Sequence, residues 1–445
     1  VSALIFVSIA YRDLFGRILG IRAGGEEAGV QASRRTWAIP ALLLGVLFLL
    51  NGVIPSLMQS YVVKPNEITL ERPFIRHNID FTRRAYKLHR PFLETRSFTA
   101  GRDITQAVVK GNEKTLANIR LWDWRALLDN LQEQQEIRLY YEFTDVDIDR
   151  YRIDGDYRQM MLSVRELEKS ALAPESQTWV SRHLKYTHGY GLVLLPVHEF
   201  LPQGSPNLFI RNIPPEVTVP GFTVDRPEIY YGEKTTDHVY VRTEEQEFDY
   251  PSGDENVYTT YQGAGGVPLE NLFKRFAYAW KFDEVQLLFS TYFTGESRIM
   301  FRREIIPRLE AVAPFLRYDR DPYPVLTPDG RIKYIVDTYT VSDRYPYSEN
   351  YQGSLGPFRG VNYMRNAVKA VVDAYDGTVS FYVFDEEDVI LRTYAEIFPG
   401  LFRPRSEMPA YLQRHVRYPD DYLTVQAEMY ATYHMEDVGA FYQRE

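Results

Sequence analysis

A long uncharged segment near the start of the chain constrains its fold more than any other feature. No charged residue occurs in residues 36–63, and the apolar heart of this segment is residues 37–58. At about 1.5 Å rise per residue, one helix over this segment can cross the ~30 Å hydrocarbon core of a bilayer. The sequence therefore predicts one full transmembrane helix, followed by a large polar region that begins near residue 60.

The residues before that helix complete a predicted membrane part, residues 1–60. Residues 1–11 are apolar but too short to span a bilayer, so we expect a truncated helix in a fragment of a longer protein. The loop between the two apolar segments is rich in arginine. The positive-inside rule then puts this loop in the cytoplasm and the large region outside it, in the periplasm or the extracellular space. The predicted location is the cell membrane, in a multi-pass protein.

Composition excludes several classes of function. The chain carries a formal net charge of −9, whereas a nucleic-acid groove needs a surplus of positive charge, so we expect no nucleic-acid partner. Cysteine is absent, which excludes disulfides, thiolate chemistry and cysteine-ligated zinc. Tyrosine is abundant, with 34 residues, and its rings suit β-rich packing and interfaces.

Turn and helix signals predict a mixed α+β region after the membrane part. Three Asp-Gly pairs, Asp154-Gly155, Asp329-Gly330 and Asp376-Gly377, each separate runs of alternating apolar residues, which is a strong β-hairpin signal. Helices are predicted between and before these hairpins, over residues 71–88 with Pro73 at the start, 121–135 with Asp123 as N-cap, 268–282 and 296–315.

The fold class predicted is therefore α+β, with the C-terminal part of a transmembrane helical bundle followed by a large extracytoplasmic domain containing several β-hairpins. The expected divisions are a first ectodomain unit at 61–200 and a proline-rich linker at 201–227. A second unit is expected at 228–445, continuing beyond the end of the chain.

Three acids alternate along one predicted strand. Asp145, Asp147 and Asp149 would face one side of it, where like charges repel unless they are solvated or bound to a metal. Ca²⁺ takes several carboxylate oxygens, so a calcium site is one interpretation. The spacing does not fit an EF-hand loop, and the sequence favours the alternative, a solvated strand edge.

Two further groups of residues are candidates for chemistry. His188 has an unperturbed pKa near ~6.5 and is the best single candidate for acid–base work, although a structural role is the favoured interpretation. Gly263, Gly265 and Gly266 precede a helix expected to open at Pro268, and exposed N–H groups there could hold an anion. An ordinary turn is the favoured alternative. The sequence contains no P-loop, G-x-S-x-G, H-E-x-x-H or kinase motif.

Long stretches of the chain resemble a known family. They include VVKPNEITLERPFIRHNI, NIRLWDWRALLDNLQEQQEIRLYYEFTDVDIDRY, PEIYYGE, EFDYPSGDEN, DPYPVLTPDGRIKYIVDTYTVSDRYPYS and NYMRNAVKAVVDAYDGTVSFYVF. In this order they resemble uncharacterised protein family 0182, large multi-pass membrane proteins of bacteria and cyanobacteria. The resemblance implies that residues 1–60 end a transmembrane bundle and that an extracytoplasmic domain follows. It implies no activity, cofactor or catalytic residue.

These observations leave three functions open. The favoured one is a binding or assembly module in a membrane complex of the cell envelope, with membrane lipids, a second copy or other membrane proteins as partners. The second is an envelope hydrolase or transferase acting on lipid-linked or saccharide substrates, with His188 and the acids near Asp145 as first suspects. The third is part of a transporter or channel. No cofactor is expected, apart from the calcium ion considered at Asp145, Asp147 and Asp149.

Overall fold

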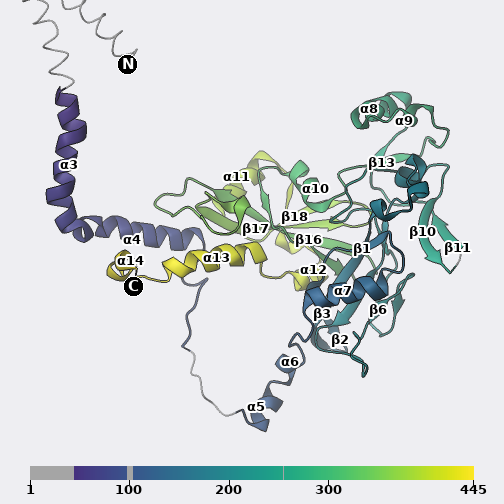
Figure 1. Ribbon diagram of the computed structural model, residues 1–445, viewed down its shortest axis with the longest axis horizontal. Helices are drawn as coiled ribbons and strands as arrows, with labels where there is room; N and C mark the ends of the chain where they lie inside the picture. Colours follow the sequence, from purple (N-terminus) through teal and green to yellow (C-terminus); the bar gives the residue numbers. More distant parts are fainter. Residues whose placement is uncertain (1–44, 98–103, 254, 445) are drawn as a thin grey trace, which may run out of the picture. The chain divides into compact units, whose positions relative to one another are not determined.

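The computed structural model describes residues 45–97, 104–253 and 255–444 (Figure 1). The chain forms two compact units, one of Val1–Asp80 with Met435–Glu445 and the other of Phe81–His434. The expected truncated helix at residues 1–11 and the first part of the uncharged segment lie outside the described residues.

Among the described residues, one helical stretch, Gly45–Ala85, is long and apolar enough to cross a membrane by length and composition. It is built from Leu49–Val53 and Gln59–Val63 in π-helical form, α3 (Ile54–Met58), a 3₁₀ turn at Lys64–Asn66 and α4 (Glu67–Ala85). The prediction that Pro73 opens a helix is wrong, because α4 begins at Glu67 and Pro73 lies inside it. Because the helix begins upstream of Pro73, the proline removes one hydrogen bond inside the helix and does not mark the helix start. Near the chain end, α14 (Val438–Gln443) is capped by Asp437.

The unit Phe81–His434 contains two six-stranded sheets. In the first, the order is β1-β3-β5-β6-β7, and β2 also pairs with β3. The strand bounds are β1 (Tyr141–Phe143), β2 (Asp147–Ile153), β3 (Asp156–Leu167), β5 (Leu192–Pro196), β6 (Ile210–Arg211) and β7 (Glu216–Val217). β1 pairs with the end of β3 at residues 165–167 and β2 with its earlier part at residues 156–162. The edge strand is therefore interrupted at residues 144–146.

In the second sheet the order is β14-β16-β17-β18-β19, and β15 also pairs with β16. All pairs are antiparallel except β18 with β19. The bounds are β14 (Arg317–Tyr318), β15 (Tyr323–Leu326), β16 (Ile332–Ser342), β17 (Tyr363–Asp373), β18 (Val379–Val383) and β19 (Phe402–Pro404).

Smaller sheets and helices complete this unit. The remaining strands are β4 (Gly189–Tyr190) with β8 (Glu228–Ile229), β10 (Glu247–Ser252) with β11 (Glu255–Thr259), and β12 (Val267–Pro268), β13 (Arg298–Met300) and β9 (Val239–Val241) in one sheet. The α-helices are α5 (Gln106–Gly111), α6 (Glu113–Leu116), α7 (Trp124–Gln135), α8 (Leu272–Phe282), α9 (Gln286–Phe289), α10 (Ile305–Val312), α11 (Val389–Ile397), α12 (Ala410–His415) and α13 (Asp420–Tyr433). Short 3₁₀ or π turns lie at Lys169–Ala171, Pro174–Ser176, Ser181–Lys185, Gly356–Phe358 and Arg405–Glu407.

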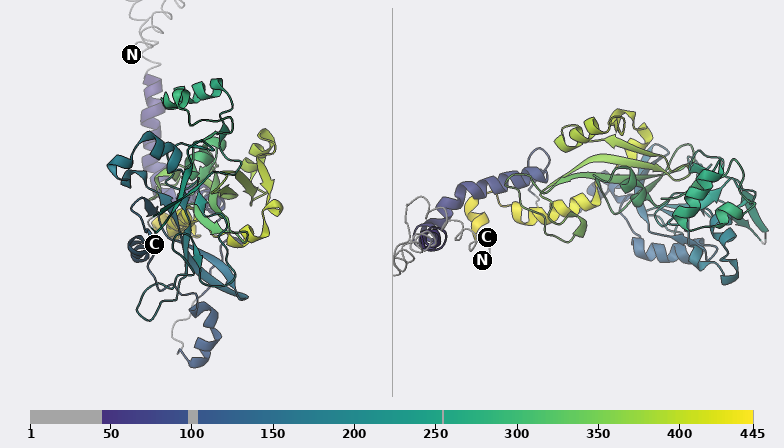
Figure 2. Two further views of the ribbon diagram at one scale, coloured as in Figure 1. Left: turned by 90° about the vertical axis from the view of Figure 1, so that its right-hand side faces the viewer. Right: turned by 90° about the horizontal axis from the view of Figure 1, so that it is seen from above.

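The two-residue period of the strands explains how the core forms. On β5, Leu192 and Leu194 join a core shared with Tyr334 and Val336 of β16, so the main core draws on both large sheets. The intervening Val193 and Leu195 pack instead with Leu127 and Leu131 of α7. In the second sheet, Ile335 and Val371 pack with Met408 and Leu412, next to and within α12. Figures 1 and 2 show the strands in the middle of this unit, with α7 on one side and α11 on the other.

Local signals predicted several of these elements correctly. All three Asp-Gly pairs sit at the turns of antiparallel hairpins, β2–β3, β15–β16 and β17–β18. Asp154 and Gly155 both have positive φ, as a type I′ turn requires. Asp123 is the N-cap of α7, accepting a hydrogen bond from the Arg125 amide.

Two further predicted helices are corrected by the structure. The helix expected over 296–315 is split into β13 and α10, because Arg302 has positive φ and the buried Arg303 guanidinium bonds to backbone carbonyls, which ends any continuous helix there. The helix expected to open at Pro268 begins at Leu272 after the N-cap Asn271, because Val267–Pro268 pairs with β13. Within 201–227, expected as a linker, β6 and β7 extend the first sheet.

Candidate functional site

The loop at residues 232–238, between β8 and β9, organises the polar interior of the unit Phe81–His434. The buried Glu166 carboxylate of β3 accepts hydrogen bonds from the Glu233 amide (2.6 Å), the Lys234 amide (2.8 Å) and the Thr235 hydroxyl (2.9 Å). A Cβ at Gly232 would lie 2.5 Å from that carboxylate, so glycine is needed for the loop to approach it so closely. These hydrogen bonds fix the start of the loop to the first sheet. Side chains along the loop contribute to three different places: an acidic centre, a polar pocket and, at the end of the loop, a histidine cluster.

The first of these places is an acidic centre made of Asp145, Asp147 and Glu233. One oxygen from each carboxylate lies within 4.8 Å of the other two. Asp145 lies in the interruption between β1 and β2, where the Ser163 hydroxyl of β3 donates to its backbone carbonyl. Asp147 is the first residue of β2, and Glu233 comes from the loop at 232–238. Two segments that are distant in sequence, residues 145–147 and the loop at 232–238, thus bring three carboxylates together.

Two of these carboxylates keep an oxygen without a hydrogen-bond partner among the described residues, namely Oδ2 of Asp147 and Oε1 of Glu233. The Asp147 side chain is only 3% exposed, so water does not fully solvate it. Its other oxygen, Oδ1, accepts from Nη1 of Arg417 at 2.9 Å, and Nη2 of Arg417 donates to Asp321 at 2.7 Å. A buried carboxylate oxygen left unpaired is costly, so the centre is suited to receive a cation.

Burial and mutual repulsion make all three groups weak acids in the absence of a cation. Burial raises the pKa of Asp145 to about 7, and repulsion by Asp321 adds to the rise. Burial and the neighbouring Asp145 raise the pKa of Asp147 well above its usual range. Burial followed by repulsion from Asp145 does the same for the pKa of Glu233. The centre therefore holds either protons or a positive ion near neutral pH.

Asp149, the third acid of the predicted calcium site, has a different partner. Its Oδ2 lies 2.7 Å from Nδ1 of His415, at the end of α12. The structure therefore brings Asp145 and Asp147 together and supplies Glu233 in place of Asp149.

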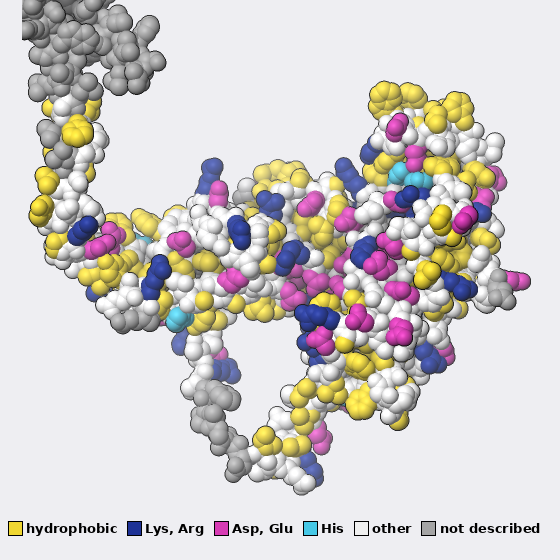
Figure 3. Space-filling model, in the orientation of Figure 1, with side chains coloured by type: hydrophobic (Ala, Val, Ile, Leu, Met, Phe, Trp, Pro, Cys, Tyr) yellow, Lys and Arg dark blue, Asp and Glu magenta, His cyan; other side chains and the backbone are white. Residues whose placement is uncertain are grey.

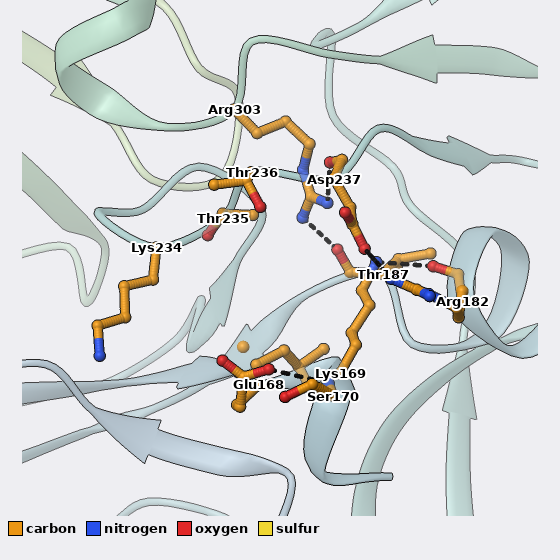
Figure 4. Close-up of a pocket in the computed structure, with 12 residues that line it drawn as sticks. Glu168, Lys169, Ser170, Arg182, Thr187, Lys234, Thr235, Thr236, Asp237 and Arg303 are labelled. Carbon is orange, nitrogen blue, oxygen red and sulfur yellow. Dashed lines mark hydrogen bonds and ion pairs between the residues drawn. The ribbon is translucent and has the colours of Figure 1, made fainter. Parts of the chain in front are cut away.

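The second place is a pocket of about 150 Å³ lined by basic, acidic and hydroxyl side chains (Figure 4). Lys169 donates to the Arg182 carbonyl at 2.6 Å and lies 3.7 Å from Asp237, which also faces Arg182 at 3.5 Å. The Arg303 guanidinium donates hydrogen bonds to the carbonyls of Tyr230, Asp237 and Thr187. Figure 4 shows Lys234 directed away from this cluster, and its ammonium pairs with Glu142. Burial, followed by repulsion from Arg303, lowers the pKa of Lys169 to about 7.

Comparison with known proteins decides the family. The sequence profile described as "Uncharacterised protein family (UPF0182)" matches residues 20–445. The chain belongs to the UPF0182 family. It is 46% identical over 409 residues to the UPF0182 protein of Desulforamulus reducens, covering 92% of this chain and 43% of that relative.

Other relatives are similarly close. The UPF0182 protein of Trichodesmium erythraeum is 48% identical over 413 residues, and that of Methanospirillum hungatei is 42% identical over 452 residues. These alignments cover 90% and 95% of this chain, and 44% and 50% of the relatives, so the chain spans about half the length of the relatives or less. No solved structure matches the chain.

In this UPF0182 chain His188 is buried and separate from the acidic centre. Its Nδ1 lies 3.1 Å from the Gly189 carbonyl, and its Nε2 lies 4.0 Å from Asp249. Burial lowers the pKa of His188 to about 4, with repulsion from Arg303 adding to the fall. Although Thr187 and Gly189 line the pocket of Figure 4, His188 itself packs against Tyr230.

The glycine loop of the UPF0182 chain is occupied by a carboxylate from elsewhere in the same chain, that of Asp376. Oδ1 of Asp376 accepts from the Ala264 amide (2.9 Å) and the Tyr261 hydroxyl (2.9 Å). A Cβ at Gly263 would lie 2.2 Å from that oxygen. The Arg298 guanidinium closes the other side by donating to the carbonyls of residues 264–266. The loop therefore serves the fold by anchoring the β17–β18 turn.

Sequence reasoning missed Glu233, because its partners lie far away in the chain and no local spacing links them. One signal was present: the acid directly follows Gly232 at the end of the PEIYYGE stretch, and a glycine beside an acid often marks close backbone approach.

Proposed function

We propose that this chain is a membrane-attached binding module whose folded region is fastened by Ca²⁺ at the acidic centre. The observation that carries the proposal is the convergence of Asp145, Asp147 and Glu233, in which Oδ2 of Asp147 and Oε1 of Glu233 have no hydrogen-bond partner among the described residues. Ca²⁺ binds carboxylate oxygens at about 2.3–2.6 Å, so oxygens on one ion lie at most roughly 5 Å apart. The 4.8 Å limit within the centre fits this range.

The arrangement supports a structural or assembly role for the ion. A cation there would join the edge of the first sheet to the loop at 232–238 and would neutralise like charges that otherwise repel. Arg417 already satisfies one oxygen of Asp147 and extends the link to the segment after α12. The ion would thus connect three parts of the fold that are distant in sequence.

Attachment to a membrane is supported by the helical stretch Gly45–Ala85. A second membrane contact is proposed at α8 and α9, and the lipid surface is its partner. Five large apolar side chains there are 54% to 81% exposed: Leu272, Phe273, Phe276, Trp280 and Phe289. Figure 3 shows this apolar surface over α8 and α9.

The composition of α8 fits a lipid surface. Leu272–Phe282 contains Lys274, Arg275 and Lys281 and no acidic residue, although the whole chain is acidic. A helix with exposed tryptophan and phenylalanine beside basic residues has the composition of one that lies in the membrane interface.

A second candidate function is an envelope hydrolase or transferase that acts on an anionic group in the pocket of Figure 4. The favouring observation is the buried Lys169, whose lowered pKa would let its amine accept a proton near neutral pH. Labelling with an amine-reactive reagent over a range of pH tests this role. A labelling midpoint for Lys169 near pH 7 supports it, and a midpoint near the ordinary lysine value argues against it.

Calcium titration of the full chain in detergent tests the main proposal. Isothermal calorimetry with CaCl₂ should give one saturable site in the wild type and none in Asp147→Asn or Glu233→Gln. Asp149→Asn is the matched control, because it removes a buried carboxylate from the same strand but outside the centre, and it should bind as the wild type does. Absence of binding by the wild type, or equal binding by Asp147→Asn, would refute the site.

A further inference from the structure

A second cluster of metal-binding side chains lies where the loop at 232–238 ends. His183 comes from the turn Ser181–Lys185, His238 precedes β9, and Glu284 follows α8. Nε2 of His183 lies 3.3 Å and Nε2 of His238 lies 3.1 Å from Oε1 of Glu284. The two imidazole rings face each other, with centroids 4.6 Å apart. Three segments converge on this cluster, which shares no residue with the acidic centre.

The hydrogen bonds around this cluster fix the direction of the ligand atoms. Nδ1 of His183 lies 2.9 Å from the His238 carbonyl, which can only accept, so Nδ1 carries the proton. The neutral ring therefore directs the lone pair of Nε2 toward Glu284. The Tyr240 hydroxyl donates to the other oxygen of Glu284 at 2.7 Å and orients that carboxylate. Such outer contacts are usual for histidine and carboxylate ligands of a metal.

We propose that His183, His238 and Glu284 bind a divalent transition-metal ion, zinc in the first instance, through Nε2, Nε2 and Oε1. Imidazole nitrogen with one carboxylate oxygen is a ligand set that suits zinc, whereas Ca²⁺ takes oxygen ligands. Nothing in the proposal depends on the calcium site, since the two clusters share no residue.

The distances agree with this assignment. Ligands about 2.0–2.2 Å from a tetrahedral zinc ion lie roughly 3.3 Å apart, close to the 3.1 Å and 3.3 Å separations observed. Although Nε2 of His238 is near Oε1 of Glu284, it makes no aligned hydrogen bond with any described residue. A ring nitrogen and a carboxylate oxygen this close need a proton or a metal ion between them.

The surroundings favour a metal that keeps one position for water. The side chains of His183, His238 and Glu284 are 14%, 15% and 12% exposed, so the cluster is reached by solvent but lies mostly inside the protein. Phe282 stacks on His238 with ring centroids 4.2 Å apart, and Trp179 lies beside His183. Figure 3 shows histidine side chains at the surface close to α8. Three protein ligands with an open fourth position describe zinc sites that can act on a bound molecule.

The test is metal binding by the full chain purified in detergent and stripped with a chelator. Dialysis against ZnCl₂ followed by elemental analysis should give one tightly held zinc per chain in the wild type. His183→Gln, His238→Gln and Glu284→Gln should each lower zinc affinity by at least tenfold, the loss expected when a ligand is removed. His198→Gln is the control, since His198 pairs with Glu199 elsewhere and should leave binding unchanged.

Cobalt gives a second measurement that needs no variant. Co²⁺ added to the stripped wild type should produce the intense visible bands of a four-coordinate N/O site, and ZnCl₂ should abolish them while CaCl₂ should not. Wild-type protein with no tightly held zinc and no such bands overturns the proposal. Zinc binding that survives all three ligand variants overturns the assignment to these residues.

Discussion

The acidic centre predicts that Asp147→Asn changes the unfolding temperature relative to the wild type in one direction without Ca²⁺ and in the other direction with it. In Asp147→Asn, one of three neighbouring carboxylates becomes neutral, and the amide oxygen can still accept from Arg417. With a calcium chelator present, the variant should unfold at the same temperature as the wild type or a higher one, because a buried repulsion is removed. With Ca²⁺ present, the order should reverse.

The size of the reversal follows from mass action. A site with Kd about 10⁻⁴ M, at the tight end of extracellular calcium modules, is stabilised by about 2.7 kcal/mol at 10 mM Ca²⁺. At about 2.1 cal/mol/K per residue, a unit the size of Phe81–His434 has an unfolding entropy of roughly 0.7 kcal/mol/K. The wild type should therefore gain ~4 °C in Tm.

Differential scanning calorimetry of the full chain in detergent, with chelator and with 10 mM Ca²⁺ in parallel, measures this gain. The Asp147→Asn variant should gain nothing, and Asp149→Asn should gain as much as the wild type. Magnesium at the same concentration separates a specific site from screening of the acidic surface, because Mg²⁺ demands a tighter octahedral shell. An equal rise in Tm for the wild type and Asp147→Asn would show the reasoning to be wrong.

Three further predictions concern other parts of the fold. The pKa of His188 is about 4 in the folded chain and ~6.5 when unfolded, so its stability contribution is present above pH 6.5 and lost as pH falls to 4. Over that pH range, the free energy of unfolding measured in urea should fall by up to about 3 kcal/mol more for the wild type than for His188→Gln. Parallel pH dependences of the two proteins would contradict this prediction. The groups facing His188, namely Arg303, Asp249 and Tyr230, are common to both proteins. Asp376→Ala should cost about 1–2 kcal/mol in chemical unfolding, because it removes the acceptor of the part-buried Tyr261 hydroxyl and of the Ala264 amide, and an unchanged midpoint would refute that role. Reconstitution in brominated lipid should quench a fluorescence component that is missing in Trp280→Phe, and equal quenching in the variant would exclude lipid contact by α8.

The fold could be predicted from sequence wherever its determinants are local. Asp-Gly turns and the Asp123 cap act within a few residues, so the three hairpins and α7 follow directly from the chain. The segment at 296–315 reads as a helix in isolation, and tertiary contacts decide otherwise. The strand at Arg298–Met300 pairs with β9 and β12, and Arg303 bonds to carbonyls of distant loops.

The candidate sites divide in the same way, into features set by neighbouring residues and features set by contacts between distant segments. Asp145 and Asp147 could be singled out because they alternate in a segment that the sequence predicts as a strand, although only Asp147 lies in β2. Glu233 and the pairing of His183 with His238 could not, because 55 residues separate the two histidines and spacing rules apply to neighbours on one helix. Nor could sequence show that the glycine loop is already occupied by Asp376, since that contact spans the second sheet and a remote loop.

One short loop supplies Glu233 to the acidic centre, lines the pocket of Figure 4 from Lys234 to Asp237 and ends at His238. Ligands that share one structural element are linked by reciprocity: if the first changes the affinity for the second by some factor, the second changes the affinity for the first by the same factor. If Ca²⁺ orders this loop, it would lower the entropic cost of binding a metal at His238. A metal at His238 would then raise the affinity for Ca²⁺ by the same factor. If both proposed sites hold their ions, the two cations together would bind more tightly than either does alone.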